Sequence, residues 1–262
     1  MVADRHYTPG PATHADLLAH MVRTGASRVV IVQPSFYGTD NRCMVESLRR
    51  LNGAGRGVAV VDETFTDADL QALADAGVRG VRINLESAGV QDPQLIGQAL
   101  TYWADRIAPL GWHVQVYASL DALAAAVPHI SALAVPIVLD HFAMVPDSTP
   151  LNDPRLALLL TLVREGKAWV KLSAPYRITQ AGDEKRDAVT ALAQVFLQAN
   201  PERVVWASDW PHTNREPGKG KLEVSAYRDI AAAKLVSDVS AWLPTQAMRQ
   251  QVLVDNPTRL YW

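Results

Sequence analysis

The chain has 262 residues, of which 48% are hydrophobic and 20% are charged, and its formal net charge is −2. So small a charge gives no electrostatic reason to expect nucleic acid or an anionic membrane as a partner. The first ten residues lack the apolar segment of a secretory signal, and no apolar run approaches the ~20 residues of a membrane helix. The single cysteine, Cys43, cannot form an internal disulfide and favours a reducing compartment. We therefore expect a cytoplasmic globular protein.

Seven short apolar runs rich in Val and Ile follow one another along the chain, separated by polar loops and helical patterns. Such runs are typical of strands buried on both faces of a parallel sheet. The predicted strands are residues 27–35, 56–63, 78–85, 112–119, 134–143, 168–176 and 203–210. Two of the helices between them, 67–77 and 92–111, are predicted to begin at an Asp cap and to end at Gly. This alternation predicts an α/β fold with a parallel sheet, and the regular spacing favours one closed barrel domain over residues 1–262.

A (β/α)₈ barrel of the TIM type needs eight strands, and the missing one would precede the helical pattern at residues 11–26. Residues 1–10 contain a Pro, a Gly and scattered charges, which is a poor strand signal. We therefore predict a barrel whose first strand is missing or degenerate.

Polar side chains gather at the ends of the predicted strands. They are Ser35, Arg82, Asn84, Tyr117, Ser119, Asp140, His141, Lys171, Ser173, Tyr176, Arg177, Asp209 and His212. Each has a structural explanation when taken alone, because an Arg can pair with a carboxylate and a buried His can be a satisfied core residue. One polar set at each strand end nevertheless favours an active site, since barrel enzymes place their chemistry at the carboxyl ends of the strands.

The stretch VVWASDWPHTN, residues 204–214, poses this choice most sharply. Ser208 and Asp209 are residue types that cap helices. Pro211 and a polar loop follow at once, however, and no helical pattern begins before about residue 222. A cap without a helix is a weak explanation, so we favour a catalytic role for Asp209.

The residue types indicate the chemistry. The Asp209 carboxylate can accept a proton from water, and His141 can orient that water, polarise a carbonyl or ligate a metal. Arg82 and Arg177 have planar guanidinium groups that suit substrate carboxylates. An acidic substrate with a hydrolysable carbonyl is the natural inference. Motifs of other enzyme classes (nucleophile elbow, P-loop, dinucleotide fingerprint, H-x-x-x-H) do not occur, and we expect Cys43, inside a helical pattern, to be a packing residue.

An ordered set of segments resembles the amidohydrolase-related TIM-barrel hydrolases, in the branch of 2-pyrone-4,6-dicarboxylate lactonase and sulfomuconolactone hydrolase. The segments are QPSFYGTDNR, RGVRINL, VQVYAS, VLDHFA, KLSAPYR and WASDWPHTN, in order from about residue 5 to the C-terminus. The resemblance implies that Asp209 is the general base that activates water and that His141 acts at the carbonyl. It also implies a set of substrate-binding residues: Tyr7, Ser35, Arg82, Tyr117 and Arg177, to which we add His212.

The sequence departs from this family in two places. Family members open with an H-x-H pair on the first strand, and this chain contains no H-x-H. That strand should lie just upstream of Tyr7. Either the sequence begins late, or this protein is a natural relative of the family that has lost the strand. The dicarboxylate lactonases also resemble one another in a second Arg six residues after the first, where this chain has Ala88. Its absence indicates a different substrate.

We expect a hydrolase that opens a carboxylate-bearing lactone or related ester with water deprotonated by Asp209. No metal or other cofactor is expected, because a catalytic zinc usually takes three protein ligands and only His141 and Asp209 are obvious ones. Two alternatives stay open: a zinc-dependent amidohydrolase or decarboxylase of the same superfamily, and a barrel that has lost catalysis and serves as a binding or scaffold protein. The expected partner is a small anionic substrate, with neither nucleic acid nor membrane; the oligomeric state stays open.

Overall fold

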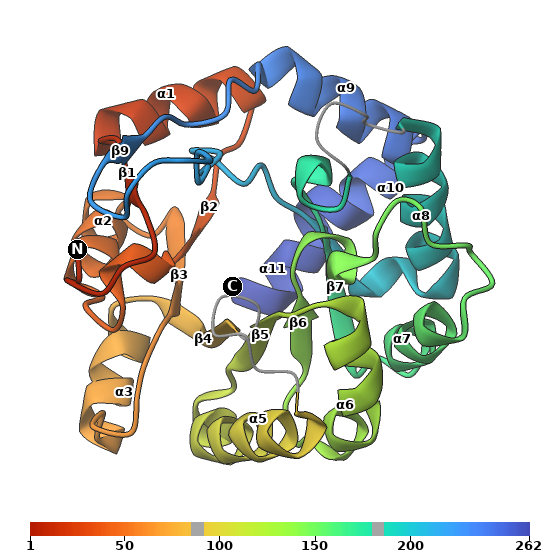
Figure 1. The fold of residues 1–262 in the computed structure, drawn as a ribbon, viewed down its shortest axis with the longest axis horizontal. Helices are drawn as coiled ribbons and strands as arrows, with labels where there is room; N and C mark the ends of the chain where they lie inside the picture. The colour runs from red at the N-terminus through yellow and green to blue at the C-terminus, as the bar shows by residue number, and fades with distance from the viewer. Residues whose placement is uncertain (85–91, 180–185) are drawn as a thin grey trace. The chain divides into compact units, whose positions relative to one another are not determined.

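The computed structural model of the protein describes residues 1–84, 92–179 and 186–262 (Figure 1). The chain forms two compact units. Unit 1 consists of Met1–Arg79 and Ser208–Ser240, and unit 2 consists of Gly80–Ala207 and Ala241–Trp262.

Unit 1 contains two neighbouring parallel strands, β2 (Val29–Val32) and β3 (Gly55–Ala59). Its other elements are α1 (His14–Thr24), η1 (Ser35–Tyr37), α2 (Arg42–Arg50), α3 (Asp67–Asp75) and most of α9 (Ala232–Trp242). Helix α1 begins at Thr13, which shares reciprocal capping hydrogen bonds with Asp16, and its buried face packs in a cluster with Trp210. Helix α1 ends at Gly25, whose φ of 71° is a conformation that glycine adopts without a Cβ clash.

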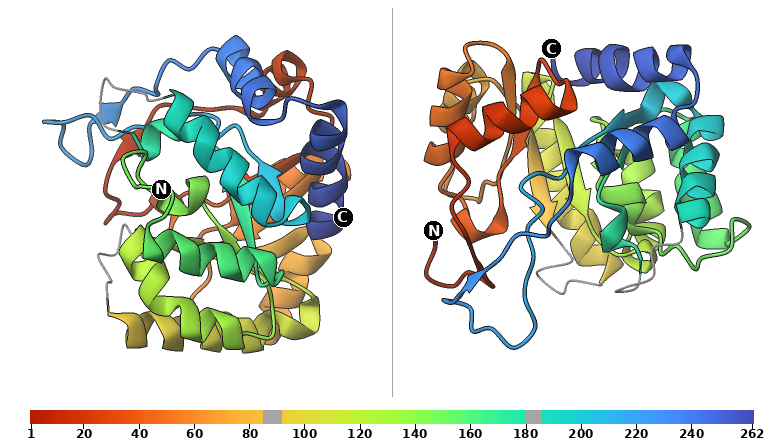
Figure 2. Two further views of the ribbon diagram at one scale, coloured as in Figure 1. Left: turned by 90° about the vertical axis from the view of Figure 1, so that its right-hand side faces the viewer. Right: turned by 90° about the horizontal axis from the view of Figure 1, so that it is seen from above.

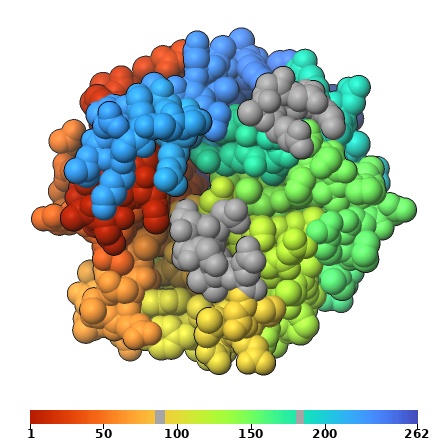
Figure 3. Space-filling view, in the orientation of Figure 1, coloured from red at the N-terminus to blue at the C-terminus, as the bar shows by residue number. Residues whose placement is uncertain are grey.

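The N-terminal segment of unit 1 does not supply a barrel strand. Its only strand, β1 (Thr8–Pro9), pairs in parallel with β9 (Val224–Ser225) in a separate two-stranded sheet. Figure 3 shows the segment that contains β9, in light blue, lying against the N-terminal residues in red. The prediction that the first barrel strand is missing is therefore confirmed.

Unit 2 contains parallel strands that are neighbours in chain order. They are β4 (Val78–Asn84, whose first two residues belong to unit 1), β5 (His113–Tyr117), β6 (Ile137–Leu139), β7 (Ala168–Leu172) and β8 (Val204–Trp206). The long helices are α5 (Pro93–Ile107), α6 (Leu120–Ala132), α7 (Pro154–Arg164) and α8 (Arg186–Ala199), and consecutive ones contact each other (Figure 2). Shorter elements are η2 (Ala108–Leu110), η3 (His141–Met144), η4 (Pro175–Arg177), η5 (Pro201–Arg203), α10 (Gln246–Gln250), η6 (Gln251–Asp255) and α11 (Asn256–Tyr261).

The strands β6 and β7 of unit 2 are buried on both faces, as their apolar composition predicts. All three residues of β6 and all five residues of β7 are buried. Helices such as α7 cover them with buried leucines, so apolar side chains fill both the strands and the layer around them. All seven strands predicted from the sequence are present, each shorter than its apolar run, and the predicted parallel α/β class is confirmed.

Two local predictions were wrong. Helix α3 is capped by Thr66 rather than by Asp67, because Thr66 is extended and its hydroxyl accepts the hydrogen bond of the Asp69 amide. Cys43 is exposed rather than packed, because the buried face of α2 is formed by its neighbour Met44 and by Leu48. The Asp cap predicted for the next helix is correct, since Asp92 accepts from the Gln94 amide. Among the described residues, no helix combines the length and the apolar character needed to cross a membrane.

Candidate functional site

The residues predicted to form the site divide between the two units. Unit 2 holds Arg82, Tyr117, His141 and Arg177, and unit 1 holds Tyr7, Ser35, Asp209 and His212. Ala88 lies outside the described residues, as does Glu86, the acid close in sequence that a structural role for Arg82 would invoke as its partner.

A buried charged group lies at the carboxyl end of the unit 2 strands, with Asp140 at its centre. The Asp140 side chain follows β6 and is only 3% exposed. Lys171 Nζ on β7 lies 2.7 Å from Asp140 Oδ1. The Gln115 side-chain amide on β5 donates to both carboxylate oxygens, at 3.0 Å each. Three adjacent strands thus supply this group, which we call the Asp140 cluster together with Arg82 of β4.

The Asp140 carboxylate remains ionised at neutral pH. Burial by itself would raise the pKa of Asp140, but the positive charges of Lys171, His141 and Arg82 lower it, as does the Lys171 hydrogen bond. The net effect holds the pKa of Asp140 far below its usual value. A buried carboxylate of this kind needs charged partners, because an unpaired charge in the interior is costly.

Arg82 contacts the cluster without completing its hydrogen bonds. Its Nε atom lies 3.5 Å from Asp140 Oδ2, and its side chain is 11% exposed. Within the described part of the chain, this Nε atom has no hydrogen-bond partner. The guanidinium carbon stands 5.4 Å from the centre of the Tyr117 ring. Asp140 is therefore an acid partner for Arg82, as a purely structural role would require. The geometry nevertheless leaves the Arg82 guanidinium able to donate hydrogen bonds to a ligand.

His141 is held in a defined orientation. Its Nδ1 atom lies 2.8 Å from the Ser173 hydroxyl, and Tyr117 meets its ring edge-to-face at 5.5 Å. The structure thus brings together His141, Tyr117 and Arg82, as the sequence predicted.

The backbone around His141 is strained. Residues 141–144 all have φ between 45° and 55°, so four consecutive non-glycine residues form a left-handed turn. This conformation costs roughly 1–2 kcal/mol per residue in L-amino acids. Phe142 and Ala143 are fully buried, and the Phe142 ring packs against Trp242, so the core holds the turn in place. Strain that packing maintains is typical of functional sites.

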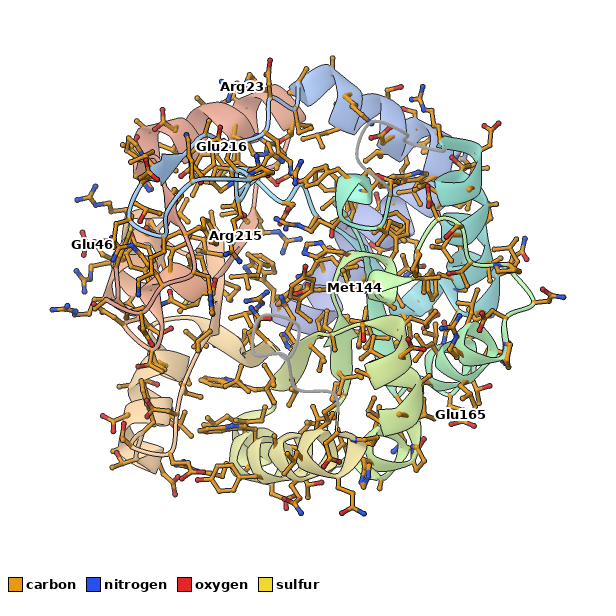
Figure 4. The ribbon with its side chains drawn as sticks, viewed as in Figure 1. Arg23, Glu46, Met144, Glu165, Arg215 and Glu216 are labelled. Carbon is orange, nitrogen blue, oxygen red and sulfur yellow. The ribbon has the colours of Figure 1, made fainter. Side chains whose placement is uncertain are left out.

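Arg177 lines a pocket of about 320 Å³ in unit 2. Its guanidinium carbon stands 5.6 Å from the centre of the Tyr176 ring. Met144, labelled in Figure 4, ends the left-handed turn and lines the same pocket. Ser119 also lines it, but its hydroxyl caps helix α6 by accepting from the Ala122 amide. We therefore keep Arg177 as a candidate binding residue and assign Ser119 a structural role.

In unit 1, Asp209 and His212 occupy the two ends of a tight turn. Both have left-handed backbones, with φ of 59° and 64°, and the His212 amide donates to the Asp209 carbonyl at 2.7 Å. The Ser208 hydroxyl accepts from the Trp210 amide. In the described part of unit 1, the next helix after this turn is α9, which begins at Ala232. The helix-cap explanation for Asp209 is therefore wrong.

Tyr7 and Ser35 lie near each other in unit 1. The Tyr7 ring meets Phe36 edge-to-face at 5.6 Å, and Ser35 is the neighbour of Phe36 in η1. The side chain of Gln33, which is buried, donates to the carbonyls of Gly38 and Asp40 and closes the loop that carries Ser35. This local network fixes the backbone of a loop that has little regular structure.

Among the described residues, no three His, Cys, Asp or Glu side chains are grouped as metal ligands would be. The carboxylate of Asp140 is already engaged by Lys171 and Gln115. A catalytic zinc site usually needs three protein ligands.

Two polar residues gain roles that the sequence alone did not indicate. Gln115 lies two positions before Tyr117 and so shares its face of β5, but its residue type alone indicates no chemistry. The sequence places Lys171 at a strand end, but only the structure shows its ion pair with Asp140. The signal for both is a polar residue inside a strand that is otherwise apolar and buried.

The family model described as Amidohydrolase (Amidohydro_2) matches residues 1–262. The chain belongs to this family. It is 37% identical over 272 residues to a 2-pyrone-4,6-dicarboxylate hydrolase of Comamonas testosteroni, covering 99% of this chain and 84% of that protein. It is 30% identical to a 4-sulfomuconolactone hydrolase of Rhizobium radiobacter, covering 98% and 83%. The expected hydrolase class and the family resemblance are therefore confirmed.

Solved structures of the family agree with the fold. A protein of Acinetobacter baumannii, described as a probable 2-pyrone-4,6-dicarboxylic acid hydrolase with citric acid bound, matches with a TM-score of 0.84 and 26% identity. The match covers 99% of this chain and 93% of that one. A structure from Pseudomonas putida matches with a TM-score of 0.83 and 32% identity, covering 99% and 91%. The predicted TIM-barrel class, without its first strand, is confirmed.

Proposed function

We propose that the protein is a metal-independent hydrolase that opens a small lactone, or a related ester, bearing at least one carboxylate or sulfonate group. The observation that carries this proposal is the charge of the Asp140 cluster. Lys171 and Arg82 bring two positive charges to the single carboxylate of Asp140. The surplus positive charge in a buried environment favours an anionic ligand, because such charges are weakly screened. A cytoplasmic location would suit a chain whose single cysteine is exposed.

Arg82 is the proposed anchor for the acidic group of the substrate. Its fork of N–H donors can bind a carboxylate through two parallel hydrogen bonds, which a lysine ammonium cannot do. Asp140 holds Lys171 and orients Arg82 through charge, so we assign Asp140 a positioning role. Arg177, which lines the pocket in unit 2, is the second proposed anion-binding residue, and Tyr117, which packs against His141, supplies a hydroxyl.

The proposed reaction begins with water. Asp209 removes a proton from the water molecule while the water oxygen bonds to the lactone carbonyl carbon. The bond from that carbon to the ring oxygen then breaks, and the ring oxygen takes up the proton that Asp209 had removed. The new carboxylic acid releases its remaining proton to solvent, so the products are a carboxylate and a hydroxyl group, or the carbonyl form of an enol. His141, oriented by Ser173, is proposed to donate a hydrogen bond to the carbonyl oxygen as negative charge develops on it.

The names of three similar proteins suggest the substrates to test. Purified protein should be assayed for ring opening of 2-pyrone-4,6-dicarboxylate, 4-sulfomuconolactone and D-galactarolactone, alongside the methyl esters of the carboxylated compounds. The third compound is included because the chain is also 29% identical to a D-galactarolactone isomerase of Agrobacterium fabrum. We expect hydrolysis of at least one acidic lactone and a large loss of kcat/KM for its ester.

Other outcomes would decide between the alternatives. Conversion of one lactone into an isomeric lactone, without net uptake of water, would make the protein an isomerase. Activity that appears only after zinc is supplied would favour the zinc-dependent alternative. Binding of acidic lactones without any conversion would favour the binding or scaffold alternative. Equal hydrolysis of acids and esters would contradict the role of the Asp140 cluster.

A further inference from the structure

Helix α1 of unit 1 carries a buried histidine that none of the proposed catalytic steps uses. His20 is 7% exposed and lies on the buried face of α1, between Leu17 and Met21. Its ring stacks on Trp210, with the ring centres 5.7 Å apart and the planes at 26°. The edge of the same ring meets His212, with the centres 6.3 Å apart. One imidazole therefore contacts two of the three residues that follow Asp209.

The segment that His20 contacts needs support, because its own backbone does not favour its shape. Asp209 and His212 both have the left-handed conformation, which non-glycine residues adopt at a cost. Inside the turn, the backbone is supported by the hydrogen bond from the His212 amide to the Asp209 carbonyl. From outside, the Arg228 amide donates to the His212 carbonyl, and Trp210 packs into the α1 cluster with Leu17, Met21 and Leu51.

The His20 ring is suited to pack against its neighbours as a neutral group rather than to carry a charge. Burial, together with the nearby His212 and Arg23, lowers the pKa of His20 to about 4 from an ordinary value of 6.5. A neutral imidazole can stack flat on an indole and still present its edge to a second ring. Protonation would place a positive charge beside these two groups and in an apolar cluster. At neutral pH, the ring therefore acts as a flat, uncharged support.

We propose that His20 is a positioning residue that holds the segment 208–212, and with it the carboxylate of Asp209, through its contacts with Trp210 and His212. This inference rests on the proposed role of Asp209 as the base. Its consequence is specific: loss of the aromatic ring at position 20 should impair turnover more than substrate binding, because a misplaced base slows the chemical step.

The test compares His20→Ala and His20→Gln, which remove the aromatic ring, with His20→Phe, which keeps a flat ring. Leu70→Ala is the matched control, because Leu70 is a buried residue of α3 in the same unit and is not part of the α1 cluster. The first readout is the indole N–H signal of Trp210 in ¹⁵N-labelled protein, assigned with Trp210→Phe. The second is kcat and KM for the acidic lactone that the wild-type protein hydrolyses.

We expect His20→Ala and His20→Gln to shift or broaden the Trp210 signal and to lower kcat about tenfold or more, with a smaller change in KM. His20→Phe should restore most of kcat, and Leu70→Ala should lose thermal stability without losing kcat. If His20→Gln keeps the wild-type Trp210 signal and kcat, or if Leu70→Ala lowers kcat as much at an equal loss of Tm, the proposal is wrong. Failure of the wild type on every lactone would refute the proposed function instead, while the Trp210 signal would still decide whether His20 holds the segment.

Discussion

Lys171 Nζ lies 2.7 Å from Asp140 Oδ1, and these two buried side chains link the carboxyl ends of neighbouring strands β6 and β7. Neither side chain is exposed enough for water to solvate its charge if the partner were removed. The pair therefore matters for stability as well as for the charge of the proposed binding group, and its two halves should not be removable one at a time.

Asp140→Asn should destabilise the protein strongly. The change leaves Lys171 and Arg82 buried without their carboxylate, and breaking a buried pair in this way typically costs about 3–5 kcal/mol. The double variant Asp140→Asn with Lys171→Met should recover part of the loss, because the buried ammonium is gone. Urea unfolding of the two single variants and the double variant measures this coupling. Additive losses would show that the pair does not act as a unit.

Acidification should destabilise the wild-type protein in a window set by His20. The pKa of His20 is lowered to about 4 in the folded state, from an ordinary value of 6.5. The unfolded chain therefore binds a proton at this residue first, so the stabilising effect present above pH 6.5 declines as the pH falls towards 4. His20→Phe cannot bind this proton. The free energy of unfolding should therefore decrease less between pH 7 and pH 5 in His20→Phe than in the wild type. An equal decrease in both proteins would contradict the assignment.

Arg82 and Arg177 should select acids over esters. Citrate is a convenient probe, because the similar Acinetobacter baumannii structure was solved with citric acid bound. We expect citrate to raise Tm of the wild type more than its trimethyl ester does. Arg82→Lys and Arg177→Lys should each reduce the citrate shift, since lysine lacks the planar fork. If both Arg are purely structural, the substitutions will change Tm without ligand and leave the preference for the acid intact.

Purified protein should contain much less than one zinc per chain. The expectation rests on the donor set: Lys171 and Gln115 engage Asp140, and no three His, Cys, Asp or Glu side chains of the described residues are grouped as metal ligands would be. Elemental analysis after purification without chelators provides the measurement. About one zinc per chain, retained through dialysis, would overturn the metal-free account and favour the zinc-dependent alternative.

The strands could be predicted from the sequence because their signal is local. Runs such as 168–176 are mostly apolar, which is typical of a strand buried on both faces, and the order of parallel neighbours follows from their alternation with helices. The same locality explains the correct Asp92 cap and the absence of a helix after Asp209.

The features that the sequence did not reveal depend on contacts between distant residues or run against local preference. The Asp140–Lys171 pair joins residues that are 31 positions apart. The left-handed turn at residues 141–144 contains no glycine, so no residue type announces it. His20 and Trp210 meet only when α1 packs against the segment after β8. The buried face of α2 depends on helical phase, which is why Cys43 proved exposed beside buried Met44.

Single-turnover kinetics of Asp209→Asn test the central claim most directly. The substitution keeps the size of the side chain and removes its ability to take a proton from water. With the acidic lactone that the wild type hydrolyses, the rate of ring opening should fall by about 10²–10⁴-fold while the dissociation constant of the lactone stays within a few-fold of the wild-type value. Near-normal ring opening by a folded Asp209→Asn variant would contradict the account and return Asp209 to a structural role.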